Sequence, residues 1–312
     1  MTKQSYVGAL AFGEPFGAVE NGKTHFWIET VVKSTYWQLL YSLRSKFSLL
    51  QFILPFFIPS DAAPKQAKFA AYTEEKISRR IALQDEDHQR DFFDDALNSG
   101  ELSEAVIKGQ AGVLIIAGSD TASTTLSAAS YFLLKHPECR ETLTKEIRGA
   151  FASAEDITDS ALQKLPYLHG VLEETLRIFP TVPFGLPRVS PGEVVDGEYI
   201  PAGVEVSAAN WQLGHDTRYW KNPWSFVPER WIGDGFGDKT SVYHPFGYGP
   251  RSCIGEALAY MELRIIIAKM IFAYDWEWLN PDLDWFRDSR YLGVWDKAAL
   301  KVKFHLRKDQ AT

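Results

Sequence analysis

A lone cysteine in a glycine-containing segment near the end of the chain has the setting of a metal ligand. The segment runs Phe-Gly-Tyr-Gly-Pro-Arg-Ser-Cys-Ile-Gly over 246–255. Gly247 and Gly249 can adopt positive φ, which lets the backbone turn tightly around Cys253. The apolar pattern over 256–273 predicts a helix directly afterwards, and the N-terminus of a helix favours the thiolate form of a nearby cysteine. The sequence therefore predicts a soft thiolate ligand for a metal centre.

An acid and a hydroxyl follow one another in the middle of a long helix predicted over 104–134. The first half of this helix is apolar, as in a helix that is buried on most sides. The second half is rich in Gly, Ser and Thr, whose side chains compete for backbone hydrogen bonds and weaken a helix. Asp120 and Thr121 lie at this weak point. Two interpretations stay open from these residues alone: a site that passes protons, or a close helix contact made by small residues.

Two further patterns contain charged residues that could form ion pairs. Glu174 and Arg177 share one face of a helix predicted over 169–179, where they could form an i,i+3 ion pair. Arg230 belongs to a Pro-Glu-Arg-Trp segment over 228–231. Neither pattern is specific when it is taken alone.

The elements that position these residues change character along the chain. Helices are predicted over 24–60 and 65–90, and short strands joined by turns are predicted over 181–210. Asp196-Gly197, between two apolar runs, predicts a β-hairpin. Alternating apolar residues over 290–306 predict a final hairpin. The fold class expected from this order is mainly α with a small β region.

Composition and charge exclude several classes of protein. The chain has 312 residues, of which 46% are hydrophobic and 23% charged, as is usual for a globular protein with a large core. Its net charge of −7 argues against a nucleic-acid partner, since such a partner needs basic residues to neutralise phosphates. The second cysteine, Cys139, falls in a charged helix far from Cys253, so we expect no disulfide framework and a reducing, intracellular compartment.

The sequence shows no signal peptide and no membrane-spanning segment. The most apolar run, over 47–58, is too short to cross a bilayer and contains Pro55. We interpret this run as part of the core, and a peripheral membrane contact is the alternative.

Four motifs together resemble those of the cytochrome P450 family, and they occur in the family's order. They are Ala-Gly-Ser-Asp-Thr over 117–121, the E-x-x-R pair of Glu174 and Arg177, the Pro-Glu-Arg-Trp segment over 228–231, and the cysteine loop. The cysteine loop carries the most specific match, and it disfavours the alternative of a buried structural cysteine. The rest of the sequence resembles most closely the fungal P450s of secondary metabolism.

The resemblance implies a P450-like fold in a single partial P450 domain over 1–312. The helical core is expected over about 24–180 and 253–275, and the β-rich part over about 181–210 and 290–306. The chain resembles the C-terminal two-thirds or so of a P450, without the N-terminal part that includes the membrane anchor. By the same resemblance the location is the endoplasmic reticulum membrane, although this chain contains no transmembrane anchor.

The resemblance also implies haem b as the cofactor, with its iron bound by the thiolate of Cys253. Asp120 and Thr121 are the acid–alcohol pair that delivers protons during oxygen activation. The other expected haem contacts are Arg251, Arg188 and Phe246.

A structural cluster and a substrate site follow from the same resemblance. Glu174, Arg177 and Arg230 are expected to form a buried cluster that holds the chain leading to the cysteine. Substrate contacts are expected at apolar positions, namely Leu114, Ala117, Val182, Phe184 and Leu292.

The implied function is a haem-thiolate monooxygenase that oxidises a small hydrophobic substrate with O2 in secondary-metabolite biosynthesis. Electrons would come from a separate P450 reductase, because the chain has no flavin or nicotinamide motif. The alternative is a truncated, inactive remnant, or a haem-binding or partner-binding module. A zinc or serine hydrolase is disfavoured, because the sequence contains neither H-E-x-x-H nor G-x-S-x-G.

Overall fold

The computed structural model describes residues 100–307 and, before them, isolated residues between 47 and 79. The described residues between 64 and 79 are helical, as expected, whereas the helix expected over 24–60 lies outside the described residues apart from Phe47 and Phe52. The chain divides into two compact units, residues 1–123 with 289–296, and residues 124–288 with 297–312. Within the described part, no helix has both the length and the apolar character needed to cross a membrane.

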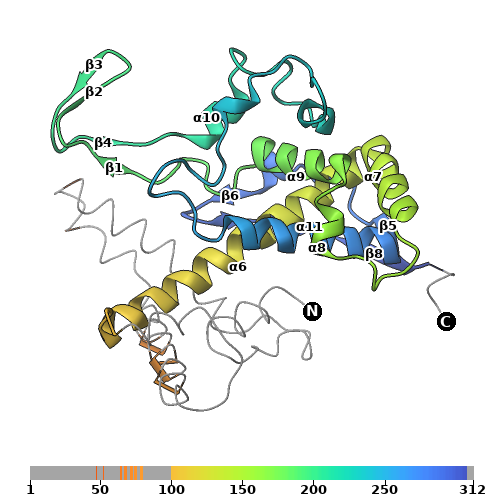
Figure 1. The fold of residues 1–312 in the computed structure, drawn as a ribbon, viewed down its shortest axis with the longest axis horizontal. Coiled ribbons are helices and arrows are strands. Elements are labelled where there is room, and N and C mark those ends of the chain that lie inside the picture. The colour runs from red at the N-terminus through yellow and green to blue at the C-terminus, as the bar shows by residue number, and fades with distance from the viewer. Residues whose placement is uncertain are drawn as a thin grey trace. The chain divides into compact units, whose positions relative to one another are not determined.

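Helices dominate the described part of the chain (Figure 1). The α-helices are α6 (Glu104–Lys135), α7 (Pro137–Ala150), α8 (Asp159–Leu162), α9 (Pro166–Ile178), α10 (Asn210–His215), α11 (Glu256–Ala273) and α12 (Trp285–Asp288). Two 3-10 turns are η2 (Pro228–Trp231) and η3 (Thr240–Val242). The predicted bounds of α6 and α11 agree with the structure to within about a residue. Helix α9 begins earlier than predicted, because Pro166 suits the first turn of a helix.

The strands are short and pair in twos. They are β1 (Arg188–Val189), β2 (Glu193–Val195), β3 (Glu198–Ile200), β4 (Glu205–Val206), β5 (Tyr274–Trp278), β6 (Arg290–Tyr291), β7 (Trp295–Asp296) and β8 (Val302–Leu306). The antiparallel pairs are β1 with β4, β2 with β3, β5 with β8, and β6 with β7. The mainly α fold with a small β region is therefore confirmed.

One predicted hairpin is confirmed and another is partly different. The β2–β3 hairpin turns at Asp196 and Gly197, whose φ angles of 50° and 85° are those of a turn that favours Asp-Gly. Near the C-terminus, β6 and β7 form a hairpin, but β8 pairs with β5, which directly follows α11. The alternation over 302–306 therefore marks a strand without identifying its partner, because pairing depends on tertiary contacts.

The core of the second unit lies between α7, α9 and α11, which pack against one another (Figure 1). Helix α7 is charged, yet it buries Cys139, Leu143 and Ile147, which recur every four residues on one face. Helix α9 is buried on nearly all sides from Tyr167 to its end. Such a helix can carry charged side chains only where they meet partners, which makes the charges on α9 informative.

Aromatic rings fill the region beside this core. Tyr131 and Phe132 of α6 are buried, and the Phe132 ring stacks on Phe226 with centroids 5.0 Å apart. The Tyr131 ring stacks on Trp285 of α12 at 5.4 Å. These pairs extend the core, since aromatic rings contribute large buried areas.

Gly170 marks the closest approach of α9 to η2. A Cβ at this position would lie 2.5 Å from the carbonyl oxygen of Pro228. We expect Gly170→Ala to lower the free energy of unfolding by about 1–3 kcal/mol, because the clash outweighs the better helix propensity of alanine. Gly149→Ala in α7 is the matched control, since nothing lies within 4 Å of its added Cβ. Urea denaturation of both variants tests this, and a Gly170→Ala protein as stable as Gly149→Ala would contradict it.

Candidate functional site

The loop around Cys253 is built to present one thiol. Gly247 and Gly249 both have a φ of 79°, as predicted from their sequence positions. The amide of Cys253 donates a hydrogen bond to the carbonyl of Phe246 at 2.8 Å, which closes the loop. Cys253 is exposed and forms no disulfide, and a Cβ on Gly255 would lie 3.8 Å from its Sγ atom. The chain thus holds a thiol at the surface, three residues before α11 begins.

A single thiol restricts the kind of metal site that can form here. Among the described residues, no group of three or more His, Cys, Asp or Glu side chains could hold a metal ion. Cys253 can supply one soft ligand to a metal at this loop, and the described residues offer no cluster that would supply the others.

Glu174 lies at the centre of a buried network of charges in α9, η2 and the segment that follows η2. Arg177 donates to both of its oxygens, through Nε and Nη2, at 2.8 Å each. The Nε atom of Arg230 donates to Glu174 Oε1 at 3.2 Å, and the side chains of all three residues are at most 2% exposed. The structure thus brings Glu174, Arg177 and Arg230 together, and their proposed role in holding the cysteine loop stays a prediction.

Asp238 is a fourth member of this network. Its Oδ2 atom accepts a hydrogen bond from Arg230 Nη1 at 2.7 Å, and its side chain is 1% exposed. Two carboxylates and two guanidinium groups then balance in charge, which is what burial of such groups requires. We call these four residues, Glu174, Arg177, Arg230 and Asp238, the arginine cluster. The indole of Trp231 also donates to Glu174, at 3.0 Å.

The arginine cluster also fixes the backbone at the end of α10 and in the segment that follows it. Arg177 donates to three carbonyls, those of Gly214, Pro223 and Ser225. Arg230 donates to the carbonyl of Asn222 at 3.0 Å. The cluster therefore fixes a loop that has little regular structure of its own.

The centre of α6 carries the predicted acid and hydroxyl. The hydroxyl of Thr121 donates to the carbonyl of Ala117 at 2.6 Å, and that of Ser123 donates to the carbonyl of Asp120 at 3.0 Å. Burial and the nearby charge of Asp120 raise the pKa of Tyr291 in β6. The first unit therefore brings the acid of α6 close to the β6–β7 hairpin, in which Leu292 forms part of the turn.

The remaining predicted positions lie in varied surroundings. Arg251 is exposed and makes no ion pair with a described residue, and Arg188 is exposed and donates to the carbonyls of Leu186 and Pro187. Phe246 is half-buried against Tyr260 of α11. Of the predicted substrate positions, Leu114, Val182 and Leu292 are half-buried, whereas Ala117 and Phe184 are exposed.

The predicted site residues are divided between the two units. The first unit contains Asp120, Thr121, Leu114, Ala117 and Leu292. The second unit contains Cys253, Phe246, Arg188, Arg251, Val182, Phe184 and the arginine cluster.

Sequence reasoning missed Asp238 and Tyr260. Asp238 follows a run of alternating glycines, which signals only a loop. Tyr260 lies among apolar residues in the sequence of α11, and its hydroxyl donates a hydrogen bond to Glu173, the neighbour of Glu174. A buried helix that carries two consecutive glutamates was the available signal, since each needs a partner.

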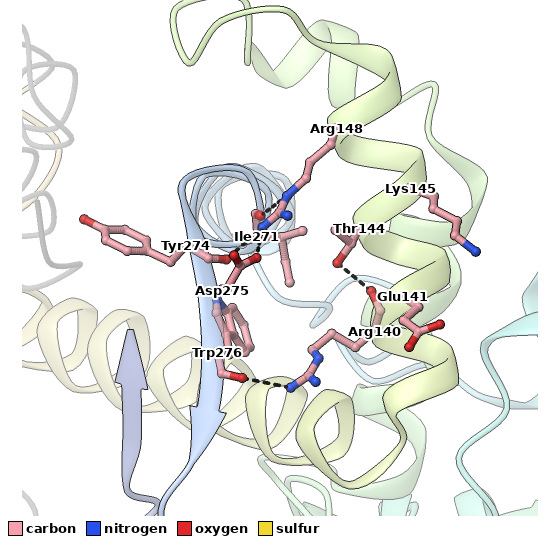
Figure 2. Close-up of a pocket in the computed structure, with 9 residues that line it drawn as sticks. All are labelled: Arg140, Glu141, Thr144, Lys145, Arg148, Ile271, Tyr274, Asp275 and Trp276. Carbon is pink, nitrogen blue, oxygen red and sulfur yellow. Dashed lines mark hydrogen bonds and ion pairs between the residues drawn. The ribbon is translucent and has the colours of Figure 1, made fainter. Parts of the chain in front are cut away.

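A hollow of ≈ 320 Å³ lies in the second unit between α7 and β5 (Figure 2). Its two arginines are already bonded: Arg140 donates to the carbonyl of Trp276, and Arg148 donates to the carbonyl of Ile271 and to Asp275. These bonds connect α7 to the end of α11 and to β5, so the residues of this pocket hold three elements together. None of the predicted site residues lines the pocket.

Known proteins resemble this chain over nearly its whole length. The family model described as Cytochrome P450 matches residues 4–303. The cytochrome P450 monooxygenase BOA3 of Botryotinia fuckeliana is 38% identical over 310 residues, which cover 96% of this chain and 61% of that protein. The cytochrome P450 monooxygenase poxC of Penicillium oxalicum is 38% identical over 294 residues, which cover 91% of this chain and 62% of that protein.

A solved structure supports the fold. The crystal structure of the cytochrome P450DA heme domain matches with a TM-score of 0.80 at 20% identity, covering 98% of this chain and 66% of that one. The chain thus spans less than two-thirds of the length of the curated relatives described above, at 61% and 62%.

Proposed function

Because the chain belongs to the cytochrome P450 family, we propose that it forms the cysteine-containing part of a haem-thiolate monooxygenase. The substrate is a small hydrophobic organic molecule, and the reaction belongs to secondary-metabolite biosynthesis, the setting that the resemblance implies. The observation that carries the proposal is the exposed thiol of Cys253, held by a glycine loop directly before α11.

The residues present fit haem b with its iron held by Cys253. The thiol is accessible, and its thiolate would be the protein's ligand to the haem iron. Tyr248 and Ile254 of the same loop expose apolar side chains, at 85% and 95%, which suits contact with an apolar macrocycle. Arg251 is an exposed cation in this loop, and we assign it, with Arg188, to the propionates.

When bound, the haem supplies the activation of O2 and the oxidation of the substrate. The protein's part is to hold the thiolate, to exclude water and to deliver protons. We assign proton delivery to Asp120 and Thr121. The hydroxyl of Thr121 donates to a carbonyl of its own helix, which fixes the position of its oxygen. A hydroxyl can both donate and accept a hydrogen bond, which is what a proton relay requires.

Thr121→Ala tests the assignment of proton delivery. We expect the variant to release a larger fraction of the NADPH oxidised as hydrogen peroxide, up to nearly all of it, since losing a general acid–base group typically slows proton transfer by about 10²–10⁴-fold. Peroxide and NADPH are measured with a fungal P450 reductase as the electron donor. Thr121→Ser keeps the hydroxyl and is the control. Equal peroxide yields from the alanine and serine variants would contradict the assignment.

Haem uptake is the decisive test of the proposed function. The purified chain is titrated with haem, reduced and exposed to carbon monoxide, and the Soret band is recorded. A thiolate-type shifted band supports the proposal. If no haem is taken up, the proposal fails and the alternative of an inactive remnant or a partner-binding module gains support.

Partners and location follow from the same proposal. We propose O2 as the co-substrate and a separate P450 reductase as the electron donor. Apolar contacts with the substrate are assigned to Leu114, Ala117, Val182, Phe184 and Leu292. An endoplasmic reticulum location of the whole protein stays a prediction, which fractionation of expressing cells can test.

A further inference from the structure

Tyr260 connects α11 to α9 through a short hydrogen bond. It lies seven residues after Cys253, on the second turn of α11. Its hydroxyl donates to Glu173 Oε1 at 2.5 Å. Glu173 is 7% exposed, so the bond is largely shielded from water. A hydrogen bond to a carboxyl group is stronger in such a buried setting than in water.

The pKa shifts of Tyr260 and Glu173 agree with the tyrosine hydroxyl as the donor and the glutamate as the acceptor. Burial and the neighbouring Glu173 raise the pKa of Tyr260, so its hydroxyl keeps its proton. Burial also raises the pKa of Glu173, whereas the bond from Tyr260 and the nearby His169 lower it. The Nδ1 atom of His169 lies 3.8 Å from Glu173 Oε1, on the exposed side of the same helix.

The ring of Tyr260 lies against the start of the cysteine loop. Its centroid is 4.9 Å from that of Phe246, at an interplanar angle of 50°. Phe246 is the residue whose carbonyl accepts the hydrogen bond from the amide of Cys253. The guanidinium of Arg264 lies 5.9 Å from the Tyr260 centroid and is held by Asp159 at 2.8 Å. The ring is therefore fixed by its hydroxyl and by contacts with its neighbours.

The two consecutive glutamates of α9 make contacts with different parts of the protein. Successive side chains on an α-helix point about 100° apart, so Glu174 can enter the arginine cluster while Glu173 reaches α11. Helix α9 packs against α11 (Figure 1), so Glu173 of α9 can support the residue of α11 that contacts Phe246.

We propose that Tyr260, anchored by Glu173, is a positioning residue that holds the Phe246–Cys253 turn in the geometry that presents the thiolate. This inference rests on the proposed function for its consequence, because the thiolate is the ligand that the turn presents. Whether Tyr260 holds the Phe246–Cys253 turn can be tested without haem.

The first measurement is amide hydrogen exchange in the full purified chain without added haem. Tyr260→Phe removes the hydroxyl and keeps the ring. We expect the amide of Cys253 to exchange about tenfold faster, the effect of losing one hydrogen bond to a carboxyl group. Exchange in α7 should not change, which separates a local effect from global destabilisation. Tyr274→Phe, the same substitution directly after α11, is the control and should leave the Cys253 amide unchanged.

A double-mutant cycle assigns the effect to the pair. Glu173→Leu should accelerate exchange at Cys253 as much as Tyr260→Phe does, and the double variant should add little further. Unchanged exchange in Tyr260→Phe, or fully additive effects in the double variant, would overturn the proposal.

The second measurement uses the haem-loaded chain. We expect Tyr260→Phe to take up haem but to show a larger fraction of ferrous–CO complex without the thiolate-type band, and Tyr274→Phe to match the wild type. An identical thiolate fraction in Tyr260→Phe and the wild type would overturn the positioning role. If the wild type takes up no haem, the proposed function fails by itself, while the exchange measurement still decides whether Tyr260 holds the turn.

Discussion

Cys253→Ala is expected to abolish the thiolate-type Soret band of the reduced, carbon monoxide-treated chain completely. Among the described residues, no cluster of metal-binding side chains can replace this ligand. The thiol is exposed, so its removal leaves no cavity in the core and should leave the free energy of unfolding of the haem-free chain nearly unchanged. The variant therefore tests ligation without a large effect on folding, and circular dichroism checks this.

Cys139→Ala is the matched control for this experiment. Cys139 is 4% exposed on the apolar face of α7. Burial raises the pKa of its thiol, so this cysteine stays protonated and is a poor ligand. We expect Cys139→Ala to keep the thiolate-type band. A band that persists in Cys253→Ala, or one that disappears in Cys139→Ala, would contradict the assignment of the ligand.

The contrast between the two cysteines illustrates what could be predicted from sequence. The glycines around Cys253 and the apolar pattern after it are local features, and the structure has the predicted turn and helix α11. The sequence around Cys139 predicts a charged helix, yet Cys139 is buried, because one narrow face of α7 packs against the core. Burial of a single residue depends on neighbours that are distant in the sequence.

Contacts between distant segments set the limit of prediction elsewhere too. Spacing alone allowed Glu174 and Arg177 to pair on one helix, but the contact with Arg230 was implied by the resemblance only. Asp238 was not expected, because nothing in a glycine-rich loop shows which side chain will turn inward. The pairing of β5 with β8 was missed for the same reason, since a strand of five residues carries no information about its partner.

The arginine cluster also shows why unpredicted partners matter physically. With Glu174, Arg177 and Arg230 alone, a buried net positive charge would remain, which is costly in a medium of low dielectric constant. Asp238 removes this excess, and its bond to Arg230 is shorter than the bond of Arg230 to Glu174, at 2.7 Å against 3.2 Å. The four residues are therefore one charge-balanced unit, and the stability of the segment after α10 depends on all of them.

Glu174→Gln is expected to lower the free energy of unfolding by about 3–5 kcal/mol, the usual effect of removing one partner from a buried ion pair. Glu174 accepts hydrogen bonds from both arginines, the indole of Trp231 and the amide of Val227. Glutamine replaces one accepting oxygen with an NH2 group, which would face donors. The charges of two buried guanidinium groups would then be balanced by one carboxylate, Asp238, which pairs with Arg230.

Urea denaturation followed by circular dichroism measures this loss. Glu277→Gln, the same substitution at a half-exposed pair with His305, is the control and should leave stability nearly unchanged, because water screens an exposed ion pair. Asp238→Asn should approach the effect of Glu174→Gln, because it leaves the same excess of positive charge. If Glu174→Gln changed stability no more than Glu277→Gln, the arginine cluster would not be a main support of the fold, and another set of contacts would have to hold the segment that leads to Cys253.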